Sequence, residues 1–180
     1  MSHWSPVELT RACTATTVPY GELVTLDAGG QVQIVQRLGS SITVRTEMGS
    51  LLRIDGTDAD AVGLDPVDVS HGAADGPFEL DRVIDALQQI YDPEIPVSIV
   101  ELGLVYRCEE LLGPEGTRRI EIDMSMTAPG CGMGDVLCAD ALRAVEAIPG
   151  VDEVEVTLVF DPPWNIGRMS EAARLQLGLL

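Results

Sequence analysis

Residues 123–135 read Asp-Met-Ser-Met-Thr-Ala-Pro-Gly-Cys-Gly-Met-Gly-Asp, and the pattern of this segment changes halfway along it. Up to Met126, apolar and polar residues alternate, which predicts a half-buried β-strand. The Thr-Ala-Pro-Gly that follows cannot continue a strand, because proline donates no ladder hydrogen bond and glycine permits an unusual turn. From Asp135 onward the apolar spacing is helical. The segment therefore predicts a strand, a tight turn and a helix, with Cys131 at the entrance of the helix.

Cys131 is the first candidate functional residue. Unpaired N–H groups and the positive end of the helix dipole collect at a helix N-terminus, and both favour a thiolate. Glycines at positions 130, 132 and 134 leave room for another molecule to approach the backbone. On spacing alone, a purely structural thiol is an equally good interpretation. The glycine-rich surroundings favour the functional one.

The composition describes a globular, strongly acidic protein. The chain has 180 residues, 46% of them hydrophobic, which is enough to bury a sizeable core. Its formal net charge is −18, and every basic residue is arginine. Such a surface argues against nucleic-acid or anionic-membrane binding and would suit a basic patch on a partner, although a merely solvated acidic surface is the simpler interpretation. Neither a membrane span nor a secretory signal is recognisable, so we expect a cytoplasmic protein.

The thiols and imidazoles form no recognisable metal motif. They are Cys13, Cys108, Cys131, Cys138, His3 and His71. Because no two cysteines make a Cys-x-x-Cys pair, zinc-finger and ferredoxin-type sites are excluded and free thiols are expected. Cys138 lies about 10.5 Å along the predicted helix from Cys131, too far to share one metal ion. We expect Cys138, Cys108 and Cys13 to be structural.

Residues 1–65 are predicted to form a small all-β domain. Its clearest strand-like runs are Glu22–Leu26, Gln31–Gln36, Ser41–Thr46 and Ser50–Ile54. Glycine-containing turns separate these short runs, which is typical of a small barrel or meander. Residues 66–77 are rich in Asp, Gly, Ala and Pro and are predicted to be a linker.

Residues 78–180 are predicted to form an α/β domain. A first amphipathic helix starts at Leu80 and ends near Asp92, because Pro93 disfavours helical geometry in the residue before it. Two strands, the helix after Cys131 and a third strand follow, and Ser170 is a plausible N-cap for a last short helix. The order α-β-β-α-β implies a two-layer sandwich of the α+β or α/β class, with helices packed on a small mixed sheet.

The loop after the first helix holds a second candidate site. Asp92-Pro93-Glu94 places two carboxylates in a rigid loop, although in isolation this is an ordinary helix-terminating sequence. Gly132-Met133-Gly134 resembles part of a phosphate-binding loop. Leu137 stands where the third glycine of that motif belongs, so this interpretation is weak.

Several blocks of the second half occur together in an order and spacing typical of one family. They are Tyr91–Val97, Val100–Tyr106, Met126–Cys131, Gly134-Asp135, Ile148–Val151 and Val159–Trp164. With them, residues 78–180 resemble the metal–sulfur cluster biosynthesis domain. When Gln36-x-Leu-Gly39 and the run Arg53–Asp60 are added, the whole chain resembles the SufT family of iron–sulfur assembly factors.

This resemblance implies a non-enzymatic role in maturing iron–sulfur proteins, with the Asp92-Pro-Glu94 and Thr127-x-x-x-Cys131 signatures as the functional surface. Cys131 would be a transient ligand of iron or of an iron–sulfur cluster. Thr127 would hydrogen-bond the loop or a sulfur, and Asp92 or Glu94 would order the loop or offer a hard oxygen ligand. Because a cluster usually takes four protein ligands, a second subunit, a client or a small thiol must supply the others.

The expected partners are therefore iron–sulfur assembly machinery and apo client proteins, with a homodimer as one way to complete the ligand set. Two other functions stay open. The chain could be a metal-free adaptor between machinery and client, or an enzyme with Cys131 as nucleophile. The enzyme would need a base beside the thiol, and neither histidine lies in residues 78–180. Two positions depart from the family pattern: Ser98 replaces a frequent Asn, and Gly132 replaces a frequent Pro and is expected to loosen the turn.

Overall fold

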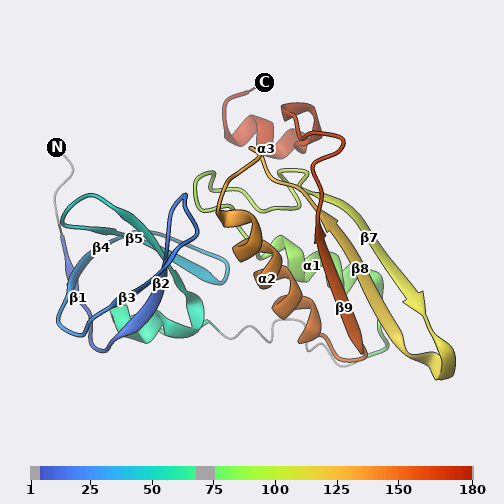
Figure 1. Cartoon of the computed structure of the whole chain (residues 1–180), viewed down its shortest axis with the longest axis horizontal. Helices are drawn as coiled ribbons and strands as arrows, with labels where there is room; N and C mark the ends of the chain where they lie inside the picture. Colours follow the sequence, from blue (N-terminus) through green and yellow to red (C-terminus); the bar gives the residue numbers. More distant parts are fainter. Residues whose placement is uncertain (1–4, 68–75, 180) are drawn as a thin grey trace.

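A computed structural model describes residues 5–67 and 76–179. Figure 1 shows a β-rich part followed by a part that contains three helices and a second sheet. The predicted linker falls largely on residues 68–75, which lie outside the described residues, as do His3 and His71. The chain is thus a mixed α/β protein with a curled antiparallel sheet and a small second sheet. This general fold class agrees with the prediction from the sequence.

The first sheet has six strands in the order β1-β4-β5-β6-β2-β3, and every neighbouring pair is antiparallel. The strands are β1 (Val7–Glu8), β2 (Cys13–Thr17), β3 (Leu23–Leu26), β4 (Gln31–Leu38), β5 (Ser41–Thr46) and β6 (Leu51–Asp55). A 3-10 helix, η1 (Gly56–Val62), follows, and the Asp55 carboxylate caps it by accepting a hydrogen bond from Thr57 N. Cys13 opens β2, a strand that is not among the runs predicted from the sequence.

The second part contains the predicted order α-β-β-α-β, followed by the last short helix. Its α-helices and strands are α1 (Leu80–Gln88), β7 (Val105–Leu112), β8 (Arg118–Met124), α2 (Met133–Glu146), β9 (Glu153–Leu158) and α3 (Glu171–Gln176). The sheet order is β7-β8-β9, antiparallel in the first pair and parallel in the second, so the sheet is mixed. The Ser170 hydroxyl caps α3 by accepting from Ala173 N.

Alternation along β8 explains how this sheet is buried on one face. Ile120, Ile122 and Met124 are almost fully buried, while the residues between them are partly exposed. On the helices, Leu87 and Leu137 join the same hydrophobic cluster. Residues of the first sheet, such as Ile42 and Ile54, form a separate cluster. These two clusters support the division into an N-terminal β domain (1–65) and an α/β domain (78–180), which we propose and use below.

The loop between α1 and β7 is longer than the sequence predicted. α1 ends at Gln88 and not near Asp92, because Tyr91 leaves the helix and pairs with Ser98 in an isolated β-bridge. Ile90 remains buried outside the helix, so the apolar pattern extends beyond the helix itself. Residues 99–103 form turns, and the Ser98 hydroxyl stabilises them by accepting a hydrogen bond from Glu101 N at 3.2 Å.

No helix in the described parts of the chain is long and apolar enough to cross a membrane.

A buried ion pair joins the two domains. Arg53 on β6 donates to the carboxylate of Asp140 on α2, and only 4% of each side chain is exposed. Arg143 bridges the same elements by donating to Asp140 Oδ1 at 2.5 Å and to Asp55 Oδ2 at 3.0 Å. Burial alone would raise the pKa of Asp55, but the hydrogen bonds from Thr57 and the charge and hydrogen bond of Arg143 outweigh it and lower that pKa.

A second contact joins the β4–β5 hairpin to the end of α1. The backbone of Gly39, at the tip of this hairpin, lies so close to Gln89 that a Cβ on Gly39 would stand 1.8 Å from the Gln89 carbonyl oxygen. The positive φ of Gly39, 53°, also favours glycine. No larger residue fits at this position without moving one domain away from the other.

Replacing Asp140 with Ala should destabilise the protein strongly, because the Arg53 guanidinium would stay buried without its counter-charge. Breaking a buried pair in this way typically costs about 3 kcal/mol of unfolding free energy. Chemical denaturation followed by circular dichroism measures the change. Asp85→Ala, at an exposed position on α1, is the matched control and should shift stability by no more than about 0.5 kcal/mol. Equal effects of the two substitutions would contradict the buried pair.

Candidate functional site

Sheet register brings the last residues of the α1–β7 loop and the turn that holds Cys131 to the same end of the α/β domain. Val105 at the start of β7 stands opposite Met124 at the end of β8. Just beyond this pair, Ser125 N, one residue after Met124, donates to Leu104 O, one residue before Val105, at 2.8 Å. The segment that leads into β7 and the turn that leaves β8 therefore flank one edge of the sheet. Figure 1 shows the α1–β7 loop at the end of the domain where α2 begins.

Asp92 organises the α1–β7 loop from inside. Its side chain is 4% exposed, and Oδ1 accepts hydrogen bonds from Glu94 N at 2.8 Å and Ile95 N at 2.9 Å. Burial raises the pKa of this carboxyl, and the two backbone hydrogen bonds oppose that rise. Of the two roles expected for Asp92, loop ordering is the one this geometry supports. The neighbouring Glu94 is exposed, so its carboxylate can meet another molecule.

Cys131 lies in the turn between β8 and α2, and its side chain is partly exposed. Its thiol donates a hydrogen bond to the carbonyl oxygen of Pro19, with 3.7 Å between Sγ and oxygen. Pro19 belongs to the β domain, so a residue 112 positions away in sequence contacts the candidate thiol. Its carbonyl is a site residue that sequence reasoning missed, because nothing in the pattern around it signals this contact.

Gly132 makes room for the same part of the β domain. A Cβ on Gly132 would stand 1.7 Å from the carbonyl oxygen of Tyr20, and one on Gly21 would stand 2.0 Å from the carbonyl oxygen of Gly132. The sequence had suggested only that Gly132 loosens the turn. In the structure, the absence of a side chain at this position lets a β-domain hairpin lie directly on the turn.

Thr127, the remaining predicted site residue, is partly buried where the chain leaves β8. Within residues 5–67 and 76–179 its hydroxyl makes no hydrogen bond that would fix its role, so its contact with the loop or with a sulfur stays a prediction. The nearby Ser125 is fully buried, and its Oγ has no hydrogen-bond partner among the described residues.

The other three cysteines lie in environments that suit structural thiols. Burial raises the pKa of Cys13, of Cys108 and of Cys138, and nearby carboxylates act in the same direction. None forms a disulfide with another described cysteine. In the described parts of the chain, no three His, Cys, Asp or Glu side chains gather closely enough to hold a metal ion.

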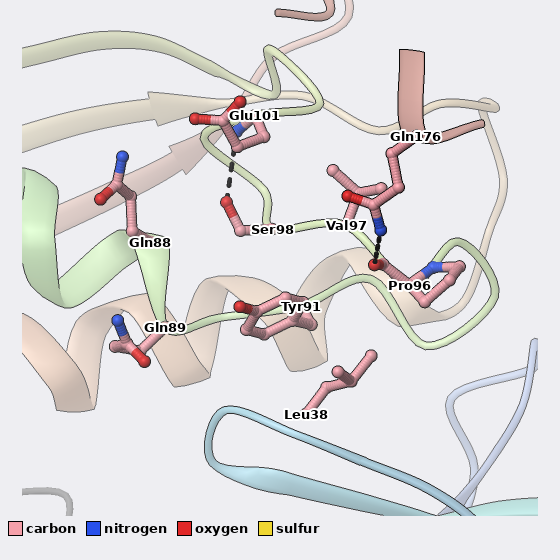
Figure 2. A pocket seen from close by; sticks show the side chains of 9 residues that line it. All are labelled: Leu38, Gln88, Gln89, Tyr91, Pro96, Val97, Ser98, Glu101 and Gln176. Atoms are coloured by element: carbon pink, nitrogen blue, oxygen red, sulfur yellow. Dashed lines mark hydrogen bonds between the residues drawn. The ribbon is translucent and has the colours of Figure 1, made fainter. Parts of the chain in front are cut away.

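A cavity of about 400 Å³ is lined in part by residues of the α1–β7 loop. It is lined by Leu38, Gln88, Gln89, Tyr91, Pro96, Val97, Ser98, Glu101 and Gln176. Figure 2 shows Leu38, from the β domain, on the side of the cavity facing Tyr91, and Gln176 donating from α3 to the Pro96 carbonyl at 3.3 Å. None of the four predicted site residues lines this cavity.

Comparison with known proteins places the α/β domain in one family. The family model described as "Iron-sulfur cluster assembly protein" matches residues 80–158. The chain is 40% identical over 98 residues to the Fe-S protein maturation auxiliary factor of Porphyromonas gingivalis, covering 54% of this chain and 90% of that protein. It is 36% identical over 90 residues to the Fe-S protein maturation auxiliary factor SufT of Staphylococcus aureus, covering 50% of this chain and 98% of that protein.

The chain belongs to the iron–sulfur cluster assembly protein family. Its resemblance to SufT-type members is confirmed by the relatives' names. The names describe auxiliary factors and carriers and not enzymes, which is consistent with a non-enzymatic role. A solved domain of unknown function from Bacillus anthracis is 35% identical, with a TM-score of 0.48, and the match covers 56% of this chain and 92% of that one. The family model stops short of the β domain.

Two substitutions at Asp92 distinguish the stabilising effect of its hydrogen bonds to the loop from the cost of burying its negative charge. In Asp92→Asn the remaining carbonyl oxygen can still accept from Glu94 N and Ile95 N, whereas Asp92→Ala leaves both N–H groups without an acceptor. Below about pH 4, where the natural carboxyl is uncharged in the folded chain, we expect Asp92→Ala to lose about 1–3 kcal/mol of unfolding free energy. Asp92→Asn should be at least as stable as the natural chain at pH 7, because no charge is buried.

The cost of burying the Asp92 charge should also make the stability of the natural chain depend on pH. Since folding raises the pKa of Asp92, the unfolded chain ionises first as the pH increases, and the stability that Asp92 confers falls from about pH 4 up to its folded-state pKa. The difference in unfolding free energy between Asp92→Asn and the natural chain should therefore grow in favour of Asn over this range. Urea denaturation at several pH values measures it. If the difference in unfolding free energy between the two chains does not change with pH, burial does not raise the pKa of Asp92.

Proposed function

We propose that this protein is an auxiliary factor in the assembly of iron–sulfur clusters and the maturation of iron–sulfur proteins, with Cys131 as a transient ligand of iron or of a cluster. The observation that carries the proposal is the placement of Cys131. It is a partly exposed thiol in the glycine-rich turn before α2, within the segment that the family model matches.

The chemistry of this site suits a carrier. A cysteine thiolate is the usual protein ligand of iron–sulfur clusters, and a cluster usually takes four. A single thiolate from this chain holds its cargo weakly, and a client, a second copy of the chain or a small thiol supplies the other ligands. Transfer is then an exchange of ligands, in which a client thiolate binds iron as the bond from Cys131 breaks. No change of oxidation state is needed.

The α1–β7 loop supports this exchange through its two carboxylates. Asp92 holds the loop in shape by its two backbone hydrogen bonds, and the exposed Glu94 offers a hard oxygen to iron or a contact to a partner. Thr127 lies at the start of the same turn as Cys131 and would hydrogen-bond the loop or a bound sulfide.

The acidic surface indicates the kind of partner. With a net charge of −18, the chain favours partners that present basic patches and disfavours nucleic acid and anionic membranes. We propose that these partners are components of the iron–sulfur assembly machinery and apo client proteins, and that the protein works in the cytoplasm. A homodimer would bring two Cys131 thiols to one cluster.

A metal-free adaptor is the second candidate. The absence of a three-ligand group in the described residues favours it, as does the hydrogen bond that the Cys131 thiol makes inside the protein. In this case Cys131 would have a structural role, and the acidic surface would dock both machinery and client.

Cys131→Ser tests the ligand role. The change keeps the size and shape of the side chain but removes the thiolate, so we expect the activity of client iron–sulfur enzymes to fall at least about tenfold in cells whose only copy is the variant. Cys138→Ser is the matched control. It makes the same chemical change on α2, seven residues after Cys131, and should leave client activity intact. Unchanged client activity with Cys131→Ser would reject the proposed ligand.

Purification under anaerobic conditions distinguishes the proposed carrier function from the adaptor function. The carrier should retain iron and sulfide that are lost in Cys131→Ser and kept in Cys138→Ser, as measured by colorimetric iron and sulfide analysis. A natural chain that supports client maturation, yet contains neither element when purified alone or together with a client, would favour the adaptor.

A further inference from the structure

We infer that the β2–β3 hairpin of the β domain, Val18–Glu22, is part of the Cys131 site: it positions the thiol and controls what can reach the sulfur. The direct contact is the hydrogen bond from the Cys131 thiol to the carbonyl oxygen of Pro19. The next residue, Tyr20, places its carbonyl oxygen where a side chain at position 132 would begin. A hairpin from one domain thus lies on the turn of the other.

The hairpin is tightly built and anchored in the α/β domain. Thr17 N donates to Glu22 O and Gly21 N donates to Thr17 O, both at 2.8 Å, and the positive φ of Gly21, 76°, completes the turn. Val18 is only 8% exposed and packs into the core cluster of the α/β domain, although it belongs to the β domain. The hairpin therefore has a fixed shape and a hydrophobic anchor beside the candidate thiol.

Two contacts away from the hairpin fix the whole β domain in the position that this requires. The Arg53–Asp140 pair fastens β6 to α2, the helix that begins directly after the Cys131 turn. The tip of the β4–β5 hairpin, at Gly39, rests on the end of α1 at Gln89. Because β6 is hydrogen-bonded to β2, the strand that leads into the Val18–Glu22 hairpin, these contacts also hold that hairpin in place.

The hairpin and an incoming atom compete for the thiol. While the thiol donates to Pro19 O, its proton and that side of the sulfur are occupied. An electrophile or metal ion that bonds the sulfur displaces the proton and ends this hydrogen bond. A partner that takes over the sulfur must therefore displace the hairpin or approach from the side it leaves open. This inference deepens the proposed function, on which it rests for the importance of Cys131, but access to the sulfur can be measured without any iron.

Gly132→Ala tests the inference by adding a methyl group that should push the hairpin away from the turn. Gly132 has φ −63° and ψ −11°, which alanine adopts without strain, so the added methyl group acts only by its clash with the Tyr20 carbonyl. The readout is the rate at which iodoacetamide alkylates Cys131, followed by peptide mass spectrometry at about pH 9.5, where an ordinary thiol is largely ionised. We expect a rate about tenfold above that of the natural chain, because the hairpin is held open.

Internal and matched controls make this rate specific. Cys108 on β7 and Cys138 on α2 serve as internal controls and should keep their own rates in Gly132→Ala. Gly113→Ala, at φ −86° with only ordinary contacts of 3.6 Å to Thr117, is the same chemical change elsewhere in the α/β domain and should leave the Cys131 rate unchanged. An unchanged Cys131 rate in folded Gly132→Ala would overturn the inference.

A second variant covers the case in which Gly132→Ala unfolds, which rapid alkylation of the buried Cys13 would reveal. Val18→Ala removes only the hairpin's anchor and adds no atoms, so the Cys131 rate should rise several-fold while that of Cys138 stays constant. If Val18→Ala leaves the Cys131 rate unchanged, the hairpin does not control access. The outcomes are independent of iron: faster alkylation together with normal maturation by Cys131→Ser would uphold the hairpin's role and reject the proposed ligand.

Discussion

The structure depends on one buried charge pair between its two domains. A guanidinium and a carboxylate that leave water lose several kcal/mol of solvation each, and they recover it only in direct contact with one another. Arg53 and Asp140 are buried to the same extent, so neither tolerates separation. This contact fixes β6 against α2 in one relative position. The position of the Val18–Glu22 hairpin on the Cys131 turn follows from it.

The consequence is a candidate site built by two domains. The α/β domain supplies the thiol, the α1–β7 loop and the helix entrance, as the family model's match to residues 80–158 leads one to expect. The β domain, which lies outside that match, supplies a carbonyl oxygen and a hairpin backbone at the same thiol. The β domain thus forms one side of the candidate site, although the family match does not include it. Gly132 allows this contact, because it has no side chain to clash with the hairpin.

Local patterns explain why parts of this arrangement could be predicted. The alternation along β8 and the Pro-Gly turn determine a strand, a turn and a helix from neighbouring residues alone, so the placement of Cys131 followed from the sequence. The α1 helix was predicted too long because Ile90 is buried by tertiary packing outside the helix. Strand β2 was missed because its residues, Cys-Thr-Ala-Thr-Thr, carry β-branched side chains but few large apolar ones.

The contacts between the domains could not be predicted in this way, since they join residues far apart in the chain. A signal was nonetheless present. The two N-terminal motifs that carried the wider resemblance, Gln36-x-Leu-Gly39 and Arg53–Asp60, contain Gly39, Arg53 and Asp55, the β-domain residues that contact α1 and α2. The sequence identified these residues as family features, and the structure supplies their physical reason.

The central claim, that the β domain rests on the Cys131 turn in solution, is tested most directly by nuclear Overhauser spectroscopy on the isotope-labelled full chain. The close approach of the Gly21 and Gly132 backbones predicts cross-peaks between their α protons. Observing these cross-peaks would establish that the Val18–Glu22 hairpin lies on the Cys131 turn in solution. Their absence, with both glycine spin systems assigned and both domains folded, would contradict it.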